Sequence, residues 1–131
     1  MDKKPSMLAC GLLEDNGRAL FLVSTNKEKK ERFLLPYDFV MPGEDPVSRI
    51  VEAFRLQTGI DAQAHEIKFE GKYNSGSRKR KLWVPAMAFR MTAKNARAIP
   101  SKAFSGFKWV PLDEIASLRL AREAEWLRGV S

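Results

Sequence analysis

Apolar and polar positions along the chain predict short β-strands arranged around one amphipathic helix. Residues 7–13 form an apolar run, and residues 18–24 form a second run after the tripeptide Asp15-Asn16-Gly17. Asn-Gly accepts the positive φ angles that tight turns require, so the two runs predict a β-hairpin. Residues 26–32 are charged and predict a loop, which the short apolar segment Phe33-Leu34-Leu35 follows.

The clearest helix signal comes after an irregular stretch, residues 36–43, which holds two prolines and a glycine. Asp45 is a candidate N-cap, Pro46 suits the first turn of a helix, and Gly59 suits its end. The apolar residues between these signals recur at helical spacing and must face a core. This stripe consists of Val47, Ile50, Val51, Phe54 and Thr58.

The second half of the chain predicts further strands and a helical C-terminus. Its patterns indicate strands at 66–73, 82–91 (interrupted by Pro85) and 107–110, a turn at 74–77, a loop at 94–105, and a helix from Pro111 through Trp126 and Leu127. Strands, helix, strands and helix in this order favour a single α+β domain over residues 1–131, with helices covering a mixed β-sheet.

Composition narrows the functional classes. Of the 131 residues, 44% are hydrophobic and 30% charged, which is ordinary for a globular protein. Cys10 is the only cysteine and His65 the only histidine, so neither an intramolecular disulfide nor a Cys- or His-rich metal site is expected. No apolar run approaches the ~18 residues of a membrane span, and residues 1–13 lack the cleavage site of an export signal. A cytoplasmic protein without a membrane partner is therefore expected.

Residues 38–60, here called the box segment, carry a recognisable motif. Leu35-Pro36 precedes it, Pro42-Gly43-Glu44 leads into the predicted helix, and Thr58-Gly59-Ile60 ends it. With these residues the segment resembles the 23-residue Nudix box, a loop-helix-loop signature of hydrolases that act on nucleoside diphosphates linked to another moiety. Residues 107–115 resemble a second recurring Nudix segment. The resemblance implies a Nudix-type α/β/α sandwich with a mixed β-sheet.

The box segment departs from the family pattern at the residues that carry chemistry. The family's three helix glutamates fall on Ala53, Leu56 and Gln57, and its orienting arginine falls on Glu52. Family members bind Mg²⁺ or Mn²⁺ through those carboxylates, and such hard cations need oxygen ligands. Ala53 and Leu56 supply none, so no cofactor is expected unless the chain is a divergent hydrolase that uses Mg²⁺ or Mn²⁺.

Three carboxylates are candidate catalytic residues under that alternative. Glu44 and Glu52 are weak candidates for metal ligands, and Glu114 lies where some family members place a catalytic carboxylate. Simpler roles compete with these: Glu52 is also placed to pair with Arg49 or Arg55 along the helix, and Glu114 to interact with a helix dipole. Asp38 and Asp45 are acidic neighbours, Asp45 more simply as the cap.

The chain is basic, with 23 Lys and Arg against 16 Asp and Glu, a formal net charge of +7. An excess of this kind favours polyanionic partners such as nucleotides, polyphosphate or RNA. Aromatic neighbours such as Tyr73 and Trp83 could stack on bases, whereas a solvated hairpin tip that protects strand edges is the alternative. The basic residues form a loop cluster of Lys27, Lys29, Lys30 and Arg32, and a tip cluster of Arg78, Lys79, Arg80 and Lys81.

Three functional hypotheses follow. The first is a Nudix-fold protein that binds nucleotide or nucleic-acid phosphates without hydrolysing them, and the second is the divergent hydrolase. The third is a structural subunit or homodimer built around an apolar patch at Ala53 and Leu56. At 100° per residue, Leu56 lies roughly opposite the core stripe, so we expect a loop, a ligand base or a partner chain to cover it.

Overall fold

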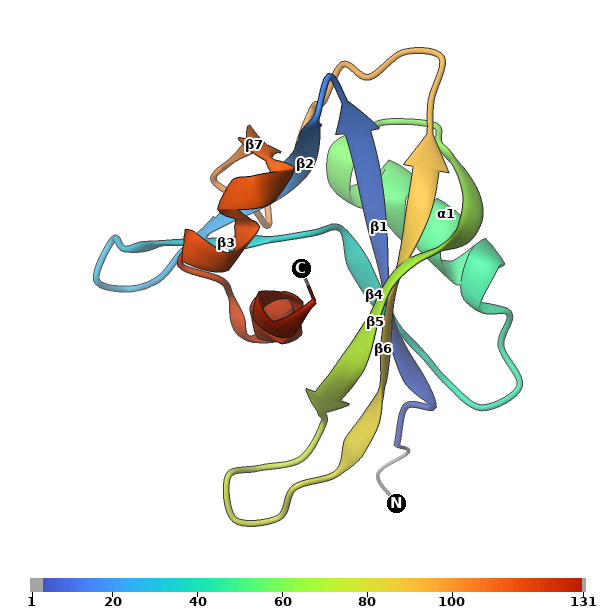
Figure 1. Ribbon diagram of the computed structural model, residues 1–131, viewed down its shortest axis with the longest axis vertical. Helices are drawn as coiled ribbons and strands as arrows, with labels where there is room; N and C mark the ends of the chain where they lie inside the picture. The colour runs from blue at the N-terminus through green and yellow to red at the C-terminus, as the bar shows by residue number, and fades with distance from the viewer. Residues whose placement is uncertain (1–3, 131) are drawn as a thin grey trace.

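The structure is a computed structural model that describes residues 4–130. This part of the chain holds seven strands, one α-helix and two 3₁₀ helices (Figure 1). In chain order they are β1 Met7–Asp15, β2 Arg18–Thr25, β3 Glu31–Leu34, β4 Tyr37–Val40, α1 Pro46–Thr58, β5 Gln63–Asn74, β6 Trp83–Thr92, β7 Gly106–Pro111, η1 Leu112–Ser117 and η2 Arg122–Gly129.

The strands form two sheets that meet at the β1–β2 hairpin. One is mixed, in the order β4-β1-β6-β5, with β1 and β6 parallel and its other pairs antiparallel. The second is antiparallel, with β2 between β3 and β7. The pairs Glu14–Ala19 and Asp15–Arg18 join them. The predicted α+β class with a mixed sheet is confirmed.

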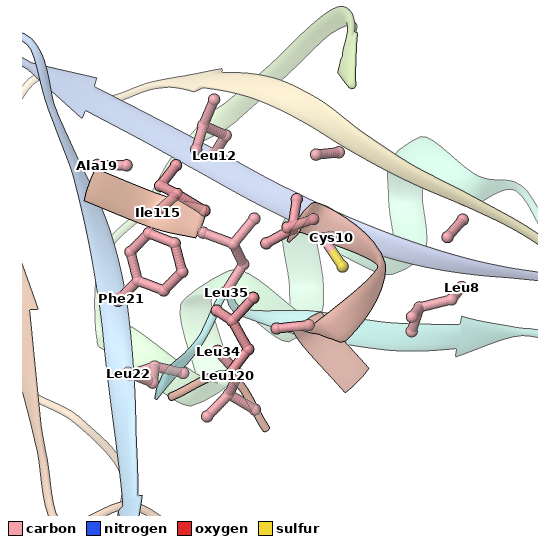
Figure 2. Packing of buried hydrophobic residues seen from close by; sticks show 14 of the residues in the cluster. Leu8, Cys10, Leu12, Ala19, Phe21, Leu22, Leu34, Leu35, Ile115 and Leu120 are labelled. Atoms are coloured by element: carbon pink, nitrogen blue, oxygen red, sulfur yellow. The ribbon is translucent and has the colours of Figure 1, made fainter. Parts of the chain in front are cut away.

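The core lies on both faces of the mixed sheet, because the side chains of β1 alternate between the faces. Leu8, Cys10 and Leu12 point to the face that η1 and η2 cover, as Figure 2 shows for this cluster. Met7, Ala9 and Leu13 point to the face that α1 covers, together with Ile50 and Phe54. The helices therefore form the outer layers of the expected α/β/α sandwich (Figure 1).

Helix α1 begins and ends where the local signals predict. The carboxylate of Asp45 accepts hydrogen bonds from the Ser48 hydroxyl (2.7 Å) and amide (3.3 Å), and these bonds hold the pKa of Asp45 below its usual value. Gly59 closes the helix in the left-handed conformation at φ 75°. One member of the predicted core stripe is wrong: Val47, in the first turn of α1, is exposed.

Two regions differ from the pattern-based prediction. The stretch at 36–43 is not irregular throughout, since Tyr37–Val40 pairs with β1 as strand β4. The predicted C-terminal helix is not one α-helix but the two 3₁₀ helices η1 and η2. An extended connection at Leu118–Ala121 separates them, where backbone bonds tie Phe33 to Arg119 and Ala121.

Pro85 lies inside β6 without breaking it. Its register partner is Lys72 of β5, and pairing with β1 starts only at the next residue, Ala86. The missing N–H therefore falls where β6 has one neighbour instead of two. No helix of residues 4–130 is long and apolar enough to cross a membrane. Residues 1–3, part of the segment assessed for an export signal, lie outside the described residues.

Candidate functional site

The box segment brings two acidic side chains to one arginine. Asp38 lies on β4, at the edge of the mixed sheet, and Glu44 lies in the turn before α1. Arg49, on the first turns of α1, reaches both: its Nη2 lies 2.6 Å from Asp38 Oδ2 and its Nη1 lies 3.8 Å from Glu44 Oε2. One internal cation thus pairs with both carboxylates at this end of α1 and offsets one of their two negative charges.

Glu44 also fixes the turn that leads into the helix. Its carboxylate Oε1 accepts a hydrogen bond from the amide of Met41 (2.8 Å), and its own amide donates to the Met41 carbonyl (3.0 Å). Gly43 between them has φ 88°, a conformation that favours glycine. The sequence prediction of Glu44 as a ligand candidate is not tested by this, but the structure gives the side chain a local role.

Gln57 uses its amide group to hold β4. The Tyr37 amide donates to Gln57 Oε1 (3.0 Å), and Gln57 Nε2 donates to the Tyr37 carbonyl (2.7 Å). Tyr37 therefore pairs with Cys10 of β1 and also with the helix that packs against the sheet. The side-chain oxygen of Gln57, at a position where the family has a glutamate, is thus engaged by a backbone N–H.

Ala53 and Leu56 do not share one exposed apolar patch. Ala53 is buried under the helix, whereas Leu56 is 59% exposed and no loop of the described chain covers it. The prediction that a neighbouring loop covers Leu56 is wrong, since loop 93–101 runs along the C-terminal end of α1 and pairs only with the carbonyls of Gln57 and Thr58.

The three candidate carboxylates do not meet. Glu52 pairs with Arg55 one turn along the exposed face of α1, at 2.8 Å, which is the simpler role that the sequence also offered. Glu114 lies on η1, on the face of the mixed sheet opposite α1 (Figure 1). Among the described residues these three carboxylates do not form a group placed to hold a metal, and their assignment as catalytic candidates stays a prediction.

The two basic clusters also lie apart. The loop cluster occupies the β2–β3 connection and the tip cluster the β5–β6 hairpin, and Figure 1 shows these loops at different corners of the molecule. In the loop cluster Lys30 pairs with Glu28 at 3.4 Å. Among residues 4–130, no member of the tip cluster lies within 4.0 Å of a carboxylate oxygen. All four members of the tip cluster therefore stay free for an anion, whereas the loop cluster has one cation, Lys30, paired with a carboxylate.

Solved structures share the fold of this chain, although no protein-family model and no curated protein sequence matches it. The MutT protein from Methanosarcina mazei superposes at a TM-score of 0.73 with 20% identity, over 98% of this chain and 91% of that one. An ADP-ribose pyrophosphatase from Streptococcus suis gives 0.66 with 10% identity, over 93% and 84%. The Nudix domain of Shewanella oneidensis NrtR, in complex with ADP ribose, gives 0.64 with 18% identity, over 97% and 86%. The chain has the Nudix fold.

The residues at the Nudix box do not fit the divalent ion that the family pattern implies. Mg²⁺ and Mn²⁺ need several oxygen ligands around one point. Asp38 and Glu44 face the guanidinium of Arg49, and Gln57 is bound to the backbone. Within the part of the chain that the structure describes, no group of three or more His, Cys, Asp or Glu side chains is placed to hold a metal.

Sequence reasoning missed two roles at the Nudix box. It placed Arg49 next to Glu52 along the helix, whereas Arg49 turns to β4 and the entry turn. It noted Gln57 only as the residue at the position of a family glutamate. Neither role has a local signal, because Asp38 and Tyr37 reach α1 only through the packing of β4 against the helix.

Proposed function

We propose that this Nudix-fold protein binds nucleotide or nucleic-acid phosphates without hydrolysing them. The observation that supports the proposal most is the pairing of Arg49 with Asp38 and Glu44. A guanidinium at this point repels a divalent cation and offsets one of the two negative charges that would attract it. The family's hydrolytic chemistry depends on such a cation, so this pairing supports binding over hydrolysis.

Binding without hydrolysis also agrees with the charge that remains accessible. The chain has a net charge of +7, but its cations are not equally available to a ligand. Arg49, Arg55 and Arg90 are engaged by carboxylates, whereas the tip cluster is not. The NrtR Nudix domain, in complex with ADP ribose, is a structural neighbour that holds a nucleotide-type ligand in this fold. We expect the ligand to be a phosphorylated nucleoside or a strand of them, and the protein to act in the cytoplasm.

A divergent hydrolase is the second candidate, because several neighbours carry the names of hydrolases or pyrophosphatases. The deciding experiment incubates the protein with dinucleoside polyphosphates, nucleotide sugars and nucleoside triphosphates in Mg²⁺ or Mn²⁺, beside an active Nudix hydrolase as control. We expect no metal-dependent turnover. Turnover that is lost in Glu44→Gln or Glu52→Gln would overturn the proposal in favour of the hydrolase.

The third hypothesis, a structural subunit or homodimer, depends on the single exposed Leu56. One apolar side chain contributes only ~2 kcal/mol when fully buried, which is little for an interface. Leu56→Glu should leave the oligomeric state and the stability unchanged. Dissociation of a dimer on this substitution, measured by light scattering, would favour the subunit hypothesis instead.

A further inference from the structure

A cavity lies between the β5–β6 hairpin and η2, with no residue of α1 in its lining. It has a volume of about 660 Å³, within the range of pockets that hold a small-molecule ligand. Its lining combines three aromatic side chains, three cations and one carboxylate. These are Tyr73, Trp83 and Trp126, then Lys72, Arg78 and Arg122, and then Glu125. We call this cavity the hairpin cleft.

The walls of the cleft are fixed by hydrogen bonds. Arg122 of η2 donates to the carbonyls of Asn74 (3.2 Å) and Gly76 (2.6 Å), and its guanidinium carbon lies 5.8 Å from the centre of the Tyr73 ring. The Asn74 side chain accepts from the amides of Gly76 and Leu82. The hairpin is thus held against η2 before any ligand arrives.

The aromatic side chains differ in how free they are. Trp126 packs against Gly71 and donates from its indole N–H to the Glu123 carbonyl (3.1 Å), and Tyr73 is buried. Trp83 is 58% exposed at the base of the hairpin. An indole face of this size at the surface is a platform on which an unpaired base can stack.

The cations of the hairpin extend beyond the cleft. Arg78 lines it, and Lys79, Arg80 and Lys81 continue from Arg78 along the tip. Among residues 4–130, none of these four, nor Lys72 or Arg122, has a carboxylate oxygen within 4.0 Å. A lone nucleotide would use only the cleft, whereas this run can neutralise several consecutive phosphates.

We propose that the hairpin cleft and the tip cluster together bind single-stranded nucleic acid, with a base stacked on Trp83 and the neighbouring phosphates on Arg78 and the tip cations. Duplex nucleic acid is disfavoured, because its bases are already stacked and paired and cannot reach an indole face. The inference rests on the proposed function, since it names the ligand class and the site that the phosphate-binding protein uses.

The test measures binding of a fluorescently labelled ten-nucleotide oligouridylate at several salt concentrations. Trp83→Ala should weaken binding by about 5- to 100-fold, the range of one lost stacking contact, and Trp83→Phe should restore most of it. Substitution of Lys79, Arg80 and Lys81 by Ser should lower the log–log salt slope by about 2, at about 0.7 per phosphate contact. The matched control substitutes three cations of the loop cluster, Lys27, Lys29 and Lys30, by Ser and should change the slope little.

The outcomes separate this inference from the proposed function. Unchanged affinity in Trp83→Ala, equal loss in the loop-cluster control, or equal affinity for a duplex would overturn the inference, while continued binding of ATP or polyphosphate would leave the proposed function standing. If the wild-type protein binds neither oligouridylate nor ATP nor polyphosphate at low salt, the proposed function itself is wrong.

Discussion

The Nudix box and the β5–β6 hairpin differ in whether their charged side chains are paired. At the box, Arg49 sits between Asp38 and Glu44, and Glu52 pairs with Arg55. At the hairpin, three cations line the cleft beside Tyr73 and Trp83, with only Glu125 as an acidic lining residue, and the other tip cations follow along the chain. The charged side chains of the box therefore pair with one another, whereas those of the tip cluster have no carboxylate partner among residues 4–130.

The two regions also differ in packing. Phe54 of α1 is fully buried against Gly11 of β1, so the layer behind the box is a closed core. Trp126 of η2 packs against Gly71 of β5 but stays half-buried beside a cleft. The comparison shows that Arg49, Glu52 and Arg55 of α1 are engaged within the chain, while the opposite face of the sheet carries an open cleft lined by cations and aromatic rings.

A matched pair of glycine substitutions gives the largest expected effect. In Gly11→Ala the new Cβ would lie 2.6 Å from Phe54 Cδ2 and 3.2 Å from Met91 Cγ, so over-packing should lower the free energy of unfolding by about 2–3 kcal/mol. In Gly71→Ala the Cβ would lie 2.7 Å from Trp126 Cε3, and the loss should stay near 1 kcal/mol because this ring can move into the cleft. Urea denaturation measures the free energy of unfolding of both variants.

The control for this pair is Gly106→Ala, where nothing lies within 4 Å of the added Cβ. The urea concentration at the midpoint of its unfolding should stay close to that of the wild type. Equal losses in Gly11→Ala and Gly71→Ala would contradict the view that the hairpin layer is the more adaptable one.

Gln57→Ala should lower the free energy of unfolding by about 1–3 kcal/mol. The substitution removes both bonds to Tyr37 and leaves the amide and carbonyl of this half-buried strand residue without a partner. Leu56→Ala is the neighbouring control, and its exposed side chain should change stability by less than about 0.5 kcal/mol. If Gln57→Ala is as neutral as Leu56→Ala, the amide does not hold β4.

Arg49→Gln should destabilise the protein by about 1 kcal/mol at low salt. Asp38 and Glu44 would then repel each other without a cation between them, although both pairs are partly exposed and solvent reduces the effect. The difference in melting temperature from wild type should shrink as salt screens the repulsion. Arg55→Gln is the control. It breaks only the exposed pair with Glu52 and should destabilise the protein by less. A salt-independent difference would point to lost packing instead of charge.

Cys10 lies in the core beneath η2, and ionisation of its thiol is expected to change stability less than any of these substitutions. Burial raises the pKa of its thiol to about 12, so the folded protein should not react with thiol reagents at pH 8. Because the folded pKa lies above the ordinary thiol value, the neutral thiol stabilises the fold below that value, and this contribution is lost as pH rises toward 12.

Trp126→Ala should accelerate labelling of Cys10, since it loosens the cover that η2 provides. Mass spectrometry of the labelled protein measures the rate. Equal rates in wild type and Trp126→Ala would mean that η2 does not open near Cys10, and rapid labelling of the wild type would contradict the buried core.

The sequence by itself determined the elements whose signals are local. The turn at Asn16-Gly17, the cap at Asp45 and the end at Gly59 each depend on backbone angles and hydrogen bonds within a few residues. The alternation of β1 follows from its pleat, and the Nudix resemblance follows from Pro42-Gly43-Glu44 and its spacing to Gly59. These features need no knowledge of what packs against them.

Only the tertiary structure decided which side chains meet. Arg49 turns to Asp38 instead of Glu52, and Gln57 binds Tyr37, because β4 is brought beside α1 by its pairing with β1. Glu114 is separated from Glu44 because η1 packs on the other face of the sheet, although the sequence allows both to be candidates. Such contacts join elements far apart along the chain, so their geometry depends on how the layers pack and not on any local pattern of residues.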